Sequence, residues 1–128
     1  MPAPDKSLAL SAVEVEALRD MRARLNRRAV SDAALLTLGG AFTQVCARVG
    51  LSGAEPLPAE RLSGPAVVKA AAAAAMPTLA RLVATLAENR KNRPADWPAL
   101  VAAGAPQAIL SRRLALAGRE PAVDTTTP

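Results

Sequence analysis

The spacing of apolar residues predicts helices along most of the chain. In residues 8–28, Val15, Leu18, Met21 and Leu25 recur every three or four positions, and charged side chains occupy many of the positions between them. This spacing places apolar side chains on one face of an α-helix. The segment therefore predicts an amphipathic helix, with Ser7 or Ser11 available as its N-cap.

A second apolar series lies between residues 31 and 49, at successive spacings of three, four, three and four. Its members are Leu35, Leu38, Phe42, Val45 and Val49. This alternation is typical of a helix–helix seam. Because no charged residue occurs between Asp32 and Arg48, more than one face of this helix is expected to be covered. We interpret residues 31–49 as the central helix, antiparallel to residues 8–28, and its apolar series as an oligomer interface.

The third predicted element is a kinked helix over residues 65–92, reached through a linker at residues 51–64 that is rich in Pro and Gly. An alanine tract at 70–75 favours helix. Pro77 interrupts it, because proline lacks the amide hydrogen that the helix needs, and predicts a kink or break near Ala75 and Met76.

A pair of short helices is predicted over residues 96–118, with the turn at Gly104 and with Pro106 in the first turn of the second helix. Apolar residues of the second helix would face inward. The polar residues left for the outward side are Gln107, Ser111, Arg112 and Arg113.

The run from Gly104 to Leu114 resembles the turn and recognition helix of bacterial and phage helix-turn-helix regulators. The chain's size and charge also resemble small phage or plasmid packaging and regulatory proteins, such as small terminase subunits. These resemblances imply a double-stranded DNA partner, with Arg suited to guanine and phosphate and Gln to adenine. Leu100 departs from the motif, which has a small residue there, and Pro98 shortens the first helix. An ordinary packed helical hairpin is the alternative.

Composition supports an all-α fold in a single domain of 128 residues, with flexible ends at residues 1–7 and 119–128. Aromatic residues make up only 2% of the chain, and alanine supplies much of the 51% that is hydrophobic. Alanine favours helices, and the scarcity of aromatic residues lowers the propensity for strands. A small helical bundle is the expected architecture.

The net charge of +5 arises in the second half of the chain, where residues 61–128 carry nine basic and four acidic side chains. Arg90, Lys91 and Arg93 form a run just before Pro94. A local excess of basic side chains favours binding to a polyanion. A genome composition that favours arginine is the alternative explanation.

The absence of histidine and the single cysteine, Cys46, argue against a metal site, a disulfide and an enzyme active site. No cofactor motif occurs, and no segment is apolar enough to predict a membrane span. We therefore expect a cytoplasmic, oligomeric DNA-binding protein that mainly contacts phosphates. The alternative is a helical assembly subunit or adaptor that oligomerises or binds a protein partner.

Overall fold

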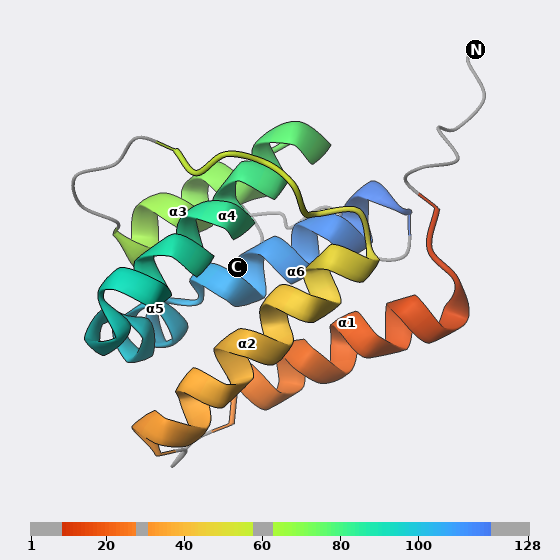
Figure 1. Ribbon diagram of the computed structural model, residues 1–128. Helices are drawn as coiled ribbons and strands as arrows, with labels where there is room; N and C mark the ends of the chain where they lie inside the picture. The colour runs from red at the N-terminus through yellow and green to blue at the C-terminus, as the bar shows by residue number, and fades with distance from the viewer. Residues whose placement is uncertain (1–8, 28–30, 58–62, 119–128) are drawn as a thin grey trace, which may run out of the picture.

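The computed structural model describes residues 9–27, 31–57 and 63–118, and these residues form helices and no strand (Figure 1). The prediction of a small all-α bundle is confirmed. The helices are α1 (Ala12–Leu25), α2 (Asp32–Arg48), α3 (Gly64–Ala72), α4 (Met76–Asn92), α5 (Trp97–Ala103) and α6 (Ala105–Leu116), with a short 3-10 helix, η2 (Pro94–Asp96), before α5.

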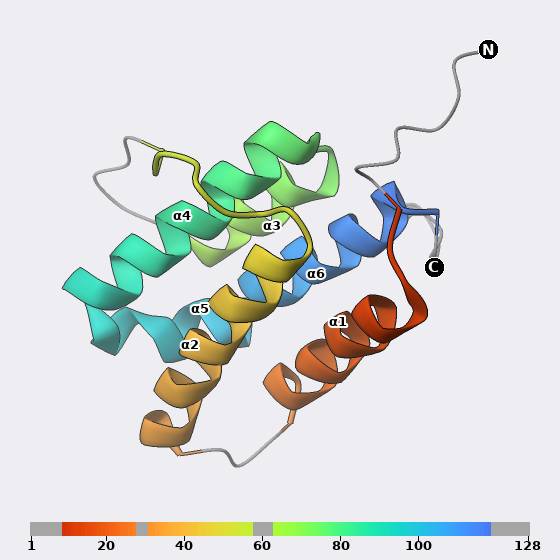
Figure 2. The same cartoon turned by 45° about the vertical axis from the view of Figure 1, so that its right-hand side comes forward.

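The helix at the centre of the bundle is α6, which packs against α1, α3, α4 and α5 (Figures 1 and 2). Ile109, Leu110 and Leu114 of α6 are completely buried. The prediction that residues 31–49 form the central helix is wrong, because α2 lies at the surface with α1 on one side and α4 and α5 on the other.

The α1–α2 pair forms the predicted antiparallel hairpin (Figure 2). Ser11 caps α1: its hydroxyl accepts a hydrogen bond from the Glu14 amide, and the Glu14 carboxylate accepts one from the Ser11 amide. This reciprocal pair lowers the pKa of Glu14. Ser31 caps α2, because its hydroxyl accepts a hydrogen bond from the Ala34 amide. Two polar caps thus set the starts of both helices.

The predicted long helix over residues 65–92 is two helices, α3 and α4, which pack beside each other. The break falls at residues 73–75, just before Pro77, which lies in the first turn of α4. Proline is compatible with a first turn because its missing amide hydrogen has no intrahelical partner there. The predicted kink is therefore a full break.

The linker between α2 and α3 contacts the bundle at several points. Leu51 is buried, and the Leu57 amide donates a 2.8 Å hydrogen bond to the hydroxyl of Thr85 on α4. Arg81 of α4 donates to the carbonyl of Glu55. The predicted flexible ends lie outside the described residues.

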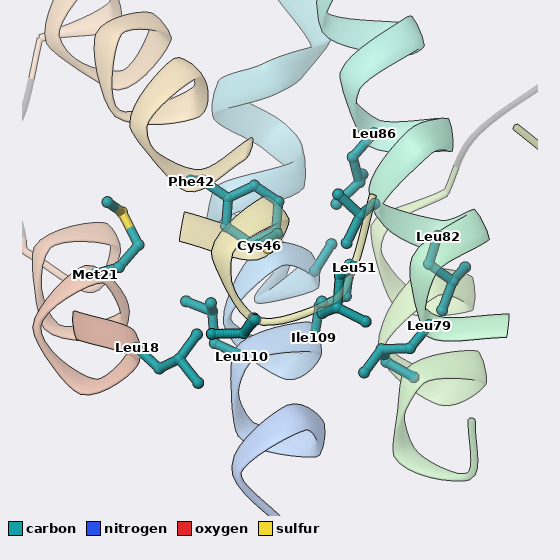
Figure 3. Packing of buried hydrophobic residues seen from close by; sticks show 14 of the residues in the cluster. Leu18, Met21, Phe42, Cys46, Leu51, Leu79, Leu82, Leu86, Ile109 and Leu110 are labelled. Atoms are coloured by element: carbon teal, nitrogen blue, oxygen red, sulfur yellow. The ribbon is translucent and has the colours of Figure 1, made fainter. Parts of the chain in front are cut away.

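The core is one cluster to which all six α-helices contribute. Figure 3 shows Ile109 and Leu110 of α6 between Leu18 of α1 and Leu79 of α4. Cys46 is fully buried among these residues, and burial raises the pKa of its thiol. A buried, protonated thiol is a poor nucleophile, so the side chain serves as a small apolar core residue.

Gly39 in α2 lets side chains of two other elements approach the helix. Gly39 is buried beneath Arg90 of α4 and Trp97 of α5, and the Trp97 indole donates a 2.7 Å hydrogen bond to the Leu35 carbonyl. Trp97 also packs at a tilt against Phe42, with ring centroids 6.2 Å apart. Gly39 is therefore needed for packing.

We expect the substitutions Gly39→Ala and Gly40→Ala to have different effects on stability. A methyl group at Gly40 has no neighbour nearer than 4.0 Å, whereas one at Gly39 would lie 3.1 Å from the Trp97 ring and 2.5 Å from Arg90 Cδ. Gly40→Ala should therefore raise the free energy of unfolding by roughly 0.5–1 kcal/mol, through helix propensity alone. Gly39→Ala should not raise the free energy of unfolding in this way, because its methyl group would crowd the Trp97 ring. Urea denaturation of both variants tests the difference, and equal stabilisation would contradict the packing.

Candidate nucleic-acid interface

The four α6 residues that the sequence suggested for DNA contact point into the protein. Gln107 and Arg113 are only 9% and 1% exposed, and Ser111 and Arg112 are partly buried. The outward-facing polar side that a recognition helix requires is therefore not formed by these residues in this fold. Each of the four has a polar partner inside the bundle.

Gln107 lies beside the end of α1. Its amide nitrogen donates to the carbonyls of Val101 (3.0 Å) and Leu25 (3.4 Å) and to the side-chain oxygen of Asn26 (3.1 Å), the C-cap residue of α1. Because all three partners are acceptors, they fix the orientation of the amide. Gln107 thus donates hydrogen bonds to groups at the C-terminal ends of α1 and α5.

Arg112 and Arg113 bind the ends of two further helices. Arg113 Nε donates a 2.8 Å hydrogen bond to the carbonyl of Val49, the C-cap of α2. Arg112 Nε donates one of the same length to the carbonyl of Ala74, just after α3. The last carbonyls of a helix lack intrahelical partners and carry partial negative charge, so a guanidinium is favoured there. The hydrogen bonds to these helix ends therefore explain why both arginines lie where they do in the fold.

Burial lowers the pKa of Arg113, and the charge of Glu14 opposes this shift. Arginine nevertheless stays protonated in proteins, so the guanidinium is a buried cation that needs hydrogen-bond acceptors. Ser111 also joins this polar layer, since its hydroxyl accepts a 2.9 Å hydrogen bond from Arg22 of α1. The polar side of α6 connects the helices of the bundle.

The other predicted contact residues, Arg90, Lys91 and Arg93, are at the C-terminal end of α4 and directly after it. Lys91 and Arg93 are exposed, and Arg90 extends across Gly39 toward α2. None of the three forms an ion pair with a carboxylate of the described residues. Arg90 and Lys91 line one surface hollow beside Glu88, whereas Arg93 lines another between α3 and α5, beside Asp96.

The five apolar residues predicted as an oligomer interface face the protein's own core. Phe42 and Val49 are 1% and 3% exposed, and Leu35, Leu38 and Val45 are partly buried against the same cluster. The heptad-like spacing is therefore satisfied within one chain, by contacts with α1, α4 and α5. Leu35, Leu38 and Val45 nevertheless keep part of their surface exposed.

The outward side of α2, which we call the α2 face, carries small and uncharged side chains. Its exposed members are Ala33, Ala34, Thr37, Gln44 and Ala47, and Gly40 and Ala41 are partly exposed. Arg27, which follows α1, lines a groove beside Ala34 and Thr37. Arg90 lies on the opposite side at Gly40, and Arg48 is the last residue of α2. Arg27 and Arg48 are not among the predicted contact residues, although Arg48 directly follows the charge-free stretch from Ala33 to Ala47.

Other kinds of site have little support among the described ranges. No group of three or more Cys, Asp or Glu residues there is placed to bind a metal ion, and no helix is long and apolar enough to cross a membrane. A hollow between the end of α1 and the start of α6 is lined by Arg27, Val101 and Gln107, where the Gln107 amide nitrogen donates to groups of the protein and its Oε1 is buried without a partner among the described residues. The basic surface is the best candidate site.

Comparisons with protein families, with curated proteins and with solved structures found no match to this chain.

Proposed function

We propose that this protein binds DNA through the phosphate backbone, using basic residues outside the helix pair of residues 96–118. The observation that carries the proposal is the group of Arg90, Lys91 and Arg93 at the end of α4. Lys91 and Arg93 are exposed, and no described carboxylate pairs with any of the three. Unpaired surface cations attract phosphates without reading sequence. The net charge of +5 supports the same conclusion.

The test is fluorescence anisotropy of a labelled random-sequence duplex at two salt concentrations. If each of Arg27, Arg48, Arg90, Lys91 and Arg93 neutralises one phosphate, log K should fall with log salt at a slope of roughly −4.5, or about 500-fold between 50 and 200 mM. The double variant Lys91→Gln/Arg93→Gln should reduce the steepness of that slope by about 2. Lys69→Gln, which removes an exposed cation from α3, is the control. Absence of binding at low salt would refute the proposal.

The second candidate function is an assembly subunit that binds a protein through the α2 face. The absence of charge between Asp32 and Arg48, on a helix with an exposed side, favours it. A surface helix of a monomer ordinarily carries charges on its outward side. Sedimentation velocity at increasing protein concentration tests this candidate, and a strict monomer would count against self-association through the α2 face.

A further inference from the structure

We propose that the α2 face is the surface along which a DNA duplex lies, with its phosphates contacting cations on both sides of α2. This inference rests on the proposed DNA binding and assigns it a location. The helix has 17 residues and is therefore about 25 Å long. This length matches roughly seven base pairs at 3.4 Å per base pair.

The cations border the α2 face on different sides. Arg27 lines the groove between α1 and α2, and the Arg90 side chain reaches from α4 to within 4.0 Å of the position that a Gly40 Cβ would occupy. Arg48 is exposed at the C-terminal end. An α-helix is about 10–12 Å wide and the DNA major groove about 12 Å, so cations on either side of one helix can meet phosphates of both strands.

No acidic side chain lies along the centre of this surface, where it would repel a phosphate backbone. No residue from Ala33 to Ala47 is charged. The carboxylate of Asp20, which lines the groove with Arg27, is 2.9 Å from Arg24 and is compensated by it. Glu88 lies near Arg90 on the other side and accepts a 3.1 Å hydrogen bond from Asn92. The local excess of charge is therefore positive.

The composition of the α2 face favours a nucleic acid over a protein partner. Protein interfaces derive most of their energy from a few large anchors, chiefly Trp, Tyr and Arg in a desolvated centre. The centre of this face offers only alanine, glycine, Thr37 and Gln44. Covering an alanine methyl contributes on the order of 0.8 kcal/mol. Small uncharged residues do, however, let a phosphate backbone approach closely.

Gln44→Glu is the most direct test, because it adds one negative charge at an exposed site and changes neither the size nor the shape of the side chain. Ala70→Glu on the exposed side of α3 is its matched control. We expect Gln44→Glu to weaken duplex binding at least threefold at low salt and Ala70→Glu to leave it unchanged. The double variant Arg27→Gln/Arg48→Gln should reduce the steepness of the salt slope by about 2. Circular dichroism checks that each variant is folded.

The outcomes separate this inference from the proposed function. If the wild type binds DNA and Lys91→Gln/Arg93→Gln weakens binding, but Gln44→Glu and Arg27→Gln/Arg48→Gln do not, the duplex lies elsewhere and only the inference fails. If the wild type does not bind at low salt, both fail. If the protein self-associates and Gln44→Glu disrupts that association without affecting DNA binding, the α2 face is a protein interface and the inference is overturned.

Discussion

Replacing Arg113 with alanine is expected to lower the free energy of unfolding by about 3 kcal/mol. The side chain is 1% exposed and donates to the carbonyl that ends α2. Its removal leaves the Val49 carbonyl without that donor, at a cost of about 1–3 kcal/mol, and opens a cavity in the core. Arg113→Met fills most of the volume and also removes a buried charge, so its loss should be nearer to 1 kcal/mol. Thermal and urea denaturation measure both losses.

Arg48→Ala is the matched control for Arg113→Ala. Arg48 is an exposed arginine at the end of α2, so its removal should change stability by less than about 0.5 kcal/mol. Equal effects of the two substitutions would contradict the buried position of Arg113. The difference also matters for binding experiments, because loss of DNA binding in Arg113→Ala would reflect unfolding before it reflected a lost contact.

The second large effect is expected for Gly64→Ala, at the start of α3. A methyl group there would overlap Cβ of Ala103 at the end of α5 and would lie 3.8 Å from the backbone of Leu100. Because Ala103 Cβ is attached directly to the backbone, α3 and α5 would have to separate. Overpacking of this kind costs roughly 1–3 kcal/mol.

The double variant Gly64→Ala/Ala103→Gly tests the origin of this loss. The second substitution removes the methyl group that Gly64→Ala would contact, at a cost of up to about 1 kcal/mol for glycine in a helix. We expect the double variant to be more stable than the sum of the single changes predicts, with a coupling of at least 1 kcal/mol. Strict additivity in urea denaturation would show that the two positions do not touch.

The helices could be predicted from sequence because the signals that define them are local. Each signal acts within a few residues. Examples are the spacing of Val15, Leu18 and Met21, the proline at position 77 and the glycine at position 104. Gly104 indeed has a positive φ of 87° between α5 and α6. Local chemistry of this kind does not depend on which helices become neighbours.

The orientation of α6 could not be predicted from local patterns. Gln107, Arg112 and Arg113 are polar and were therefore assigned to the outward side. Their partners are carbonyls at residues 25, 49 and 74, which lie far away in the sequence. A long side chain with a polar end can be buried when acceptors converge on that end. This convergence is a property of the tertiary fold.

The hydrogen bonds of α6 also bear on the order in which the protein folds during synthesis. The bond from Arg113 to Val49 spans 64 positions, and the bond from Arg22 to Ser111 spans 89. A growing chain that has completed α1, α2 and α3 still lacks the side chains that bind the ends of these helices. Contacts between distant parts of a chain slow folding, and chains generally fold as their domains emerge. We therefore expect the bundle to acquire its native packing only after α6 has left the ribosome.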